Sequence, residues 1–195
     1  MVKNKLLLCV RNAESFNAQD SGFFFRQIDD MVMVLYIVLK DNGPENRAIT
    51  PMSRSIAETW GVSDDDVFSA ALENTMVLAP PRIKIQLPFC QPSEKPYQVS
   101  AKVPDGALVT TESAVDGAVA MFYKGVQERL SEIMHGDYYA LFSGKDECHI
   151  HPVDSIPVSG LKMLLDNVNR TYPDTMLTQH IYRYNAKKHE LKMEL

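Results

Sequence analysis

The stretch "MVMVLYIVLK" at residues 31–40 contains the longest run of apolar side chains in the chain. Its apolar part, Met31–Leu39, is about half as long as the roughly 20-residue segment that crosses a membrane as a helix. The sequence "DNGPEN" follows directly, and its Asn-Gly and Gly-Pro steps mark a turn. A continuous apolar run that ends at a turn predicts a strand buried on both faces. We expect "RAIT" to return beside it as the second strand of a hairpin.

The order strand, strand, helix recurs in three segments, 31–79, 107–134 and 138–171. Short turns between consecutive strands favour antiparallel pairing, and helices after each pair favour an α+β fold. We therefore predict a mainly antiparallel sheet built from strand-strand-helix units, with helices packed on the sheet and a C-terminal β-hairpin. The strands are expected at "LLLCV", "ALVTT", "GAVAMFY", "YYALF" and "ECHIHPV", and in the hairpin at "HIYRYN" and "HELKMEL".

Capping residues and apolar periodicity predict the helices. Ser53 is expected to cap "RSIAETW", and Gly61 ends that helix. Ser63 and Asp66 form a capping box that opens "DDDVFSAALENTMVL". Two later helices, "GVQERLSEIM" and "SGLKMLLDNVNRTY", are amphipathic. Their expected inward residues are Val126, Leu130, Ile133 and Met134 in the first, and Leu161, Leu164, Leu165 and Val168 in the second.

The chain length of 195 residues is that of one domain with a sizeable core. Four prolines between residues 88 and 104 exclude a helix or a central strand there. We therefore expect a single α+β domain over residues 1–195, with the Pro-rich loop 88–104 as the candidate boundary between subdomains.

Composition and charge narrow the class of function. The formal net charge of -5 has the wrong sign for a general nucleic-acid or anionic-membrane binder. The three cysteines are far apart with no CxxC, which argues against a disulfide framework or a zinc ribbon and fits a reducing compartment. Neither GxGxxG, a P-loop nor GxSxG is present. We expect a soluble cytoplasmic protein with no cofactor and no nucleic-acid or membrane partner.

The segment "IAETWGVSDDDVF", residues 56–68, has the spacing of a DNA-binding helix-turn-helix. A recognition helix presents its first residues to bases and phosphates, and here those residues are Asp64, Asp65 and Asp66. Their charge repels DNA and suits the N-terminal end of a helix dipole. Nucleic-acid binding through the helical hairpin 53–79 is therefore the weakest alternative.

The motif "ECHIHP" suggests a metal site. On a strand, Glu147, His149 and His151 lie on one face, and alternating histidines with a carboxylate are ligands for Zn or Fe(II). His180 or Asp154 would complete the site. The alternative function is therefore a metal-dependent hydrolase with Glu147 as ligand or general base. The competing interpretation is a solvent-facing polar stripe whose intervening residues point inward.

The preferred hypothesis is a non-enzymatic domain that binds a protein partner through its terminal hairpin. Edge strands pair readily with other chains, and self-association through the same edge is an equal alternative. In "HIYRYN", His180, Tyr182 and Tyr184 share one face and Arg183 lies on the other. Such a stripe is typical of core pairs, and less often of a partner-binding edge to which Tyr182, Arg183 and Tyr184 would contribute. Deleting residues 186–195 is then expected to abolish association without unfolding the rest.

Several blocks together resemble a known family. They are "IDDMVMVLYIVL", "WGVSDDDVFSAALENT", "DGAVAMFYKGV", "GDYYALFS", "ECHIHP", "VNRTY" and "HIYRYN", in this order between Leu6 and Asn185. Their order and spacing resemble an uncharacterised bacterial family of unknown function, common in anaerobic Gram-positive gut bacteria.

The resemblance implies a bacterial cytoplasmic protein without recognised catalytic residues. It also implies a further N-terminal portion before "LLLCVRNAESF", so that the chain looks like a short member or a fragment. The family tends to have apolar residues at the positions of His149 and His151, and a histidine near Asp146. This difference implies a strand position that is more often buried than ligating.

Overall fold

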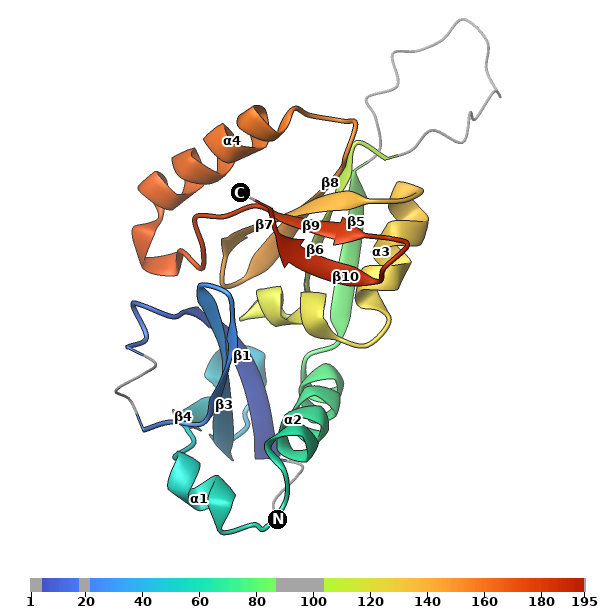
Figure 1. Cartoon of the computed structure of the whole chain (residues 1–195). Coiled ribbons are helices and arrows are strands. Elements are labelled where there is room, and N and C mark those ends of the chain that lie inside the picture. The colour runs from blue at the N-terminus through green and yellow to red at the C-terminus, as the bar shows by residue number, and fades with distance from the viewer. Residues whose placement is uncertain (1–4, 18–21, 87–103, 195) are drawn as a thin grey trace, which may run out of the picture.

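The computed structural model describes residues 5–17, 22–86 and 104–194. The strands form two antiparallel sheets, one of four strands and one of six. In Figure 1 the four-stranded sheet lies below with α1 and α2, and the six-stranded sheet lies above with α3 and α4. The predicted α+β class with antiparallel pairing is confirmed, but the strands are divided between two sheets.

The four-stranded sheet is built around the apolar strand β3. Its strands are β1 (Leu6–Asn12), β2 (Phe25–Ile28), β3 (Met31–Lys40) and β4 (Ala48–Pro51). β1 pairs with one edge of β3, and β2 and β4 pair with successive parts of the other. Both faces of β3 are buried, as predicted. One face, with Met31, Met33 and Leu35, enters the main core, and the other faces a second apolar cluster.

The six-stranded sheet has the order β10-β9-β7-β8-β6-β5, so β10 and β5 are its edges. Its strands are β5 (Pro81–Gln86), β6 (Gly106–Thr111), β7 (Tyr138–Gly144), β8 (Glu147–Pro152), β9 (Tyr182–Asn185) and β10 (Glu190–Met193). β9 and β10 form the predicted C-terminal hairpin. β2 and β5 were not predicted from the sequence.

The helices cover the sheets on separate faces. The α-helices are α1 (Arg54–Glu58), α2 (Asp64–Leu78), α3 (Val126–Met134) and α4 (Val158–Thr171), and the 3-10 helices are η3 (Pro44–Asn46), η4 (Gly117–Phe122) and η5 (Pro173–Thr175). α2 packs on β1, η4 and α3 join the main core, and α4 covers Tyr139, Leu141 and Ile181 on the opposite face of the large sheet. None of the helices in the described ranges has the length and apolar character to cross a membrane.

Three local expectations are corrected. The segment "GAVAMFY" is not a strand but the buried helix η4, which begins after Asp116 in a left-handed conformation with φ 48. Its apolar run fits a buried strand and a buried helix equally well, so periodicity alone does not separate them. Ser53 makes no capping bond, because its hydroxyl pairs with that of Ser55. Leu164 is 45% exposed, on the outer face of α4.

The main core runs through both sheets. It contains Leu8 and Leu35 from the small sheet together with Val109 and Tyr182 from the large one. Residues of both sheets therefore share one core. The candidate subdomain boundary at 88–104 lies outside the described residues except for Pro104.

Candidate functional site

The stripe on β8 has the predicted alternation. Cys148 and Ile150 are fully buried, while Glu147, His149 and His151 are partly exposed on the other face. His149 Nε2 lies 3.1 Å from a Glu147 carboxylate oxygen. Burial, and next the neighbouring His149, lowers the pKa of His151, whose buried Nδ1 has no hydrogen-bond partner.

The further ligands proposed for a metal site are not assembled around this pair. His180 is paired with Asp30 instead, and Asp154 is exposed beyond the end of β8. Across residues 5–17, 22–86 and 104–194 no group of three or more His, Cys, Asp or Glu side chains is placed to hold a metal ion. A metal-dependent hydrolase would therefore need a ligand set other than the one expected from the sequence.

The helical hairpin 53–79 has a structural role in the small sheet. Ser63 accepts a bond from the Asp66 amide and caps α2, as predicted. The aspartates that follow form ion pairs, Asp64 with Arg54 at 3.1 Å and Asp65 with Arg26 at 2.6 Å. The first turn of α2 thus presents acidic side chains, which are unsuited to contact with phosphates.

The aromatic residues of β9 face the core. Tyr182 and Tyr184 are each 1% exposed, and Tyr184 stacks on Tyr138 with ring centroids 4.9 Å apart. Arg183 points to the opposite face and pairs with Asp137 at 3.0 Å. Of the three side chains proposed for partner binding, only that of Arg183 is therefore accessible.

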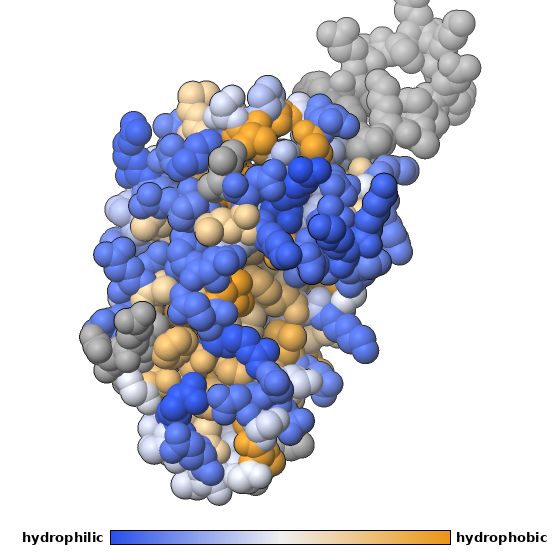
Figure 2. Space-filling view, viewed as in Figure 1, coloured by the Kyte–Doolittle hydropathy of each residue, from blue (hydrophilic) through white to orange (hydrophobic). Residues whose placement is uncertain are grey.

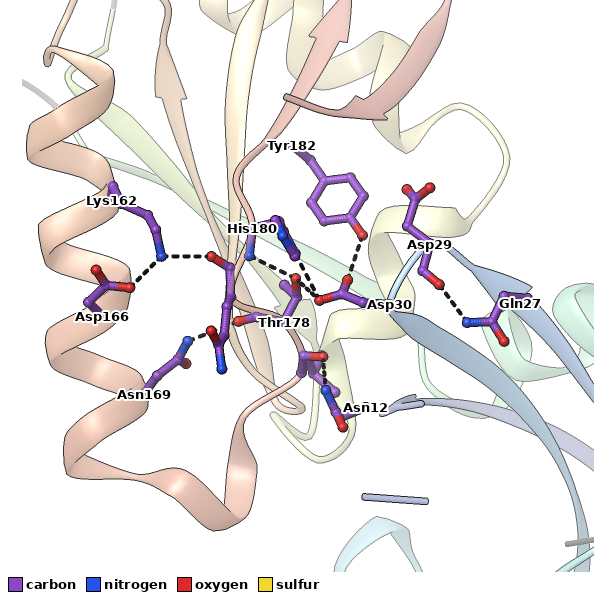
Figure 3. Close-up of polar contacts among 12 residues, drawn as sticks. Asn12, Gln27, Asp29, Asp30, Lys162, Asp166, Asn169, Thr178, His180 and Tyr182 are labelled. Atoms are coloured by element: carbon purple, nitrogen blue, oxygen red, sulfur yellow. Dashed lines mark hydrogen bonds and ion pairs between the residues drawn. The ribbon is translucent and has the colours of Figure 1, made fainter. Parts of the chain in front are cut away.

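A polar cluster at the sheet junction was not predicted from the sequence. The carboxylate of Asp30, in the turn between β2 and β3, accepts hydrogen bonds from Thr178 Oγ1 at 2.7 Å, His180 Nδ1 at 3.0 Å and the Tyr182 hydroxyl at 3.1 Å (Figure 3). A proton on Nδ1 leaves Nε2 of neutral His180 as the acceptor. No local pattern marks Asp30, because aspartates are common in turns.

Neighbouring bonds hold the segment that carries this cluster. Asn12 of β1 donates to the Leu177 carbonyl at 3.0 Å. From α4, Asn169 donates to the Thr178 carbonyl at 2.9 Å and Lys162 to the Gln179 carbonyl at 3.0 Å (Figure 3). Residues 177–180 are therefore fixed between the small sheet and α4, and the cluster joins the two sheets.

A second junction contact was also missed. Arg11 of β1 forms a 2.6 Å ion pair with Asp116, and the Cys9 thiol lies 3.5 Å from the other oxygen of the same carboxylate. Burial, and next the charge of Asp116, raises the pKa of Cys9. The thiol therefore stays protonated at neutral pH, which is unsuited to nucleophilic chemistry. Next to it lies a pocket of about 180 Å³ between β1, the end of α2 and the loop before η4.

The C-terminal edge of the large sheet is open along β10. No strand in the described part of the chain pairs with its outer side. Lys187, Lys188 and Lys192 are exposed on this hairpin. Figure 2 shows strongly hydrophilic side chains over the region where Figure 1 places β9 and β10.

Comparison with known proteins identifies one relationship. No curated protein and no solved structure matches the chain. The model of a family of unknown function, DUF5688, matches residues 1–186 of the 195. Because this match covers nearly the whole chain, the protein belongs to the DUF5688 family.

Proposed function

We propose that the protein is a non-enzymatic binding domain that pairs an extended segment of a partner protein with the free edge of β10. The observation that carries this proposal is the position of β10 as the outermost strand of a six-stranded antiparallel sheet. An added strand satisfies backbone groups that the edge otherwise leaves to water.

The register of the hairpin identifies the available backbone groups. Glu194 N donates to the Ile181 carbonyl at 2.9 Å, which continues the pairing of Lys192 with Arg183. Hydrogen-bonded and non-bonded pairs alternate in an antiparallel ladder. The amide and carbonyl groups of Leu191 and Met193 therefore point away from β9, where a partner strand would pair.

Side chains along β10 favour a particular kind of partner. Lys192 is 72% exposed on the same face as Arg183, whereas Leu191 and the 44% exposed Met193 lie on the other face. Because Lys192 already pairs with Glu190 at 2.8 Å, apolar residues beside Met193 would contribute most to the choice of a complementary strand.

The hairpin is held in place before any partner arrives. Asp137 accepts bonds from the Ala186 amide at 2.9 Å and from Arg183 at 3.0 Å. The Asn185 side chain accepts from the Lys187 amide at 3.1 Å and from the Lys188 amide at 3.0 Å and closes the turn. An edge that is already ordered loses less conformational entropy on binding.

The test uses a proline at the position whose amide points outward. Peptides enriched from a random display library against the parent protein are measured by titration with Met193→Pro and, as the matched control, Met193→Ala. The proline removes the outward N–H without breaking a bond to β9, so Met193→Pro should weaken binding about tenfold or more while Met193→Ala binds almost normally. Equal binding by the two variants would reject strand addition at β10.

Self-association through the same edge is the other form of this proposal. Sedimentation of the parent protein, Met193→Pro and a chain lacking residues 186–195 measures it directly. A concentration-dependent dimer that both changes abolish supports pairing of β10 with its copy. A dimer that survives in Met193→Pro places the interface elsewhere.

A reducing, cytoplasmic setting in a bacterium is part of the proposal. Cys9 and Cys148 are free buried thiols, which is the usual state of cysteines in such a compartment. Mass spectrometry of the protein isolated from its host under alkylating conditions would test this. Recovery with intermolecular disulfides would contradict it.

A further inference from the structure

An apolar groove opens at one end of the small sheet. It lies between α1 and the place where β1 begins and β3 ends, and its volume is about 390 Å³. Among the described residues that line it, all but Lys5 are apolar: Leu6, Ile37, Val38, Leu39, Ile56 and Trp60. Figure 2 shows hydrophobic side chains at the surface near the lower end of the molecule, where Figure 1 places this part of the small sheet. Because Leu6 belongs to the main core, the core reaches the surface here.

Apolar side chains protrude on both sides of this groove. Leu39, at the end of β3, is 63% exposed, and Ile56 of α1 is 46% exposed. A single exposed apolar residue is ordinary, but several around one hollow mark a surface that another molecule covers. A protruding leucine beside an apolar hollow is complementary to a second copy of the same surface. In such a symmetric contact, Leu39 of each copy packs against Ile56 and Trp60 of the other.

The two walls of the groove carry opposite charges. Lys5, on the sheet wall, is exposed and forms no ion pair with any described residue. On the side of α1 and α2, Glu58 and Asp66 are exposed carboxylates that also have no ion pair within the described ranges. The neighbouring Asp64 and Asp65 differ, because arginines already pair with them.

This charge arrangement also favours a second copy. A two-fold axis that runs along the groove places the sheet wall of one copy on the helix wall of the other. Each Lys5 then faces the acidic side of its neighbour, and the contact is made twice. The surface is therefore complementary to itself in charge as well as in shape.

We propose that this groove is the interface of a symmetric homodimer. Leu39 of each copy packs against Ile56 and Trp60 of the other, and Lys5 of each copy faces Glu58 of the other. The interface lies on the small sheet, away from the β10 edge of the large sheet. It does not depend on the proposed partner binding.

The first experiment uses Trp60 as a reporter. It is the only tryptophan of the chain and lines the groove, so its emission responds to what covers this surface. Sedimentation velocity and tryptophan emission are measured over one dilution series of the parent protein. We expect a reversible dimer and a blue shift of the emission with the same midpoint, because contact with the other copy removes water from the indole. A protein that stays monomeric up to about 1 mM, the weak end of specific association, overturns the proposal. A dimer without the emission shift overturns it as well.

Two variants locate the contact. Leu39→Asp puts a charge where the leucine would be covered, which should weaken the dimer about tenfold or more. The matched control is Met163→Asp, because Met163 is 62% exposed on α4 and does not line the groove. Both positions are exposed, so both variants should keep the parental unfolding temperature. Parental association of Leu39→Asp would reject the groove as the interface.

Met193→Pro separates this dimer from self-association through β10. It changes only the edge of the large sheet, so the groove dimer should persist in it at parental affinity. A dimer that is lost in Met193→Pro and kept in Leu39→Asp would assign association to β10 and reject the groove. Loss in Leu39→Asp alone leaves strand addition at β10 to be decided by its own peptide titration.

An exchange of charges tests the two-fold arrangement. Lys5→Glu alone and Glu58→Lys alone each place like charges across the interface and should weaken the dimer about threefold or more. In an equimolar mixture of the two variants, both reciprocal contacts join opposite charges. Sedimentation at low ionic strength, where screening is weak, should then show a mixed dimer about as stable as the parental one. A mixture that associates no better than its separate components would reject the pairing of Lys5 with the acidic wall.

Discussion

Asp30 and Tyr182 lie 152 residues apart in the chain, and their carboxylate and phenol are joined by a 3.1 Å hydrogen bond across the two sheets. Burial, and next the charge of Asp30, raises the pKa of Tyr182, so the phenol remains the donor. Thr178 and His180 donate to the same carboxylate. A single turn residue thus fixes the segment that leads into β9.

Removing the negative charge of Asp30 should lower the stability of the protein. Asp30→Asn replaces one of the two accepting oxygens with an amide donor, so either the Tyr182 hydroxyl or the pair Thr178 and His180 loses its acceptor. We expect a loss of about 1–3 kcal/mol in the free energy of unfolding, measured by urea denaturation. The matched control is Asp29→Asn, since asparagine tolerates the left-handed backbone at φ 51. Equal stability of the two variants would show that the cluster contributes nothing.

Thr75 should be needed for its hydroxyl rather than for its shape. Its Oγ1 accepts from the Leu8 amide at 2.9 Å and donates to the Ala71 carbonyl at 2.6 Å, in a fully buried position. Thr75→Val leaves the Leu8 amide unsatisfied and should cost about 1–3 kcal/mol. Thr171→Val, in which an exposed hydroxyl bonds only its own helix, should change stability by less than about 0.5 kcal/mol. If Thr75→Val and Thr171→Val unfold at the same urea concentration, the Thr75 hydroxyl adds nothing to stability and the prediction is wrong.

Gly117 should tolerate no side chain. An added Cβ would overlap the Asp146 carbonyl and the Thr110 hydroxyl, so backbone would have to move. Gly117→Ala should destabilise the protein by about 3 kcal/mol or more. Gly160→Ala is the comparison, because its Cβ would lie close only to Cγ2 of Ile156, at 3.1 Å, with no backbone atom in the way, and alanine favours the helix. A folded Gly117→Ala protein with parental stability would contradict the close packing of η4.

His151 should make stability depend on pH in the histidine range. Burial, with the neighbouring His149, lowers the pKa of His151 in the folded state. Its contribution to stability is therefore complete above the unfolded value of about 6.5 and is lost as the pH falls below it. Urea midpoints at about pH 7.5 and about pH 5.5 should differ less in His151→Gln than in the parent. The same decline in both proteins would exclude His151 as its source.

Features with a local physical cause could be predicted from the sequence. The unbroken apolar run of β3 requires burial on both faces, and the alternation in β8 turns Cys148 and Ile150 inward. Capping residues and helical periodicity located α2, α3 and α4, with Leu164 as the exception. Each of these depends on neighbours within a few residues, so its signal is present in the sequence itself.

What the tertiary structure decided depends on long-range contacts. The division of the strands into two sheets, the bond between Asp30 and Tyr182, and the pocket that contains both Arg47 and Asp116 join segments far apart in the chain. An isolated aspartate or arginine in a loop belongs to no periodic pattern, so the sequence does not indicate which residue it contacts. Such residues come together when both sheets contribute apolar side chains to one core. The sequence by itself therefore determined the elements and their buried faces, and only packing determined which polar groups meet.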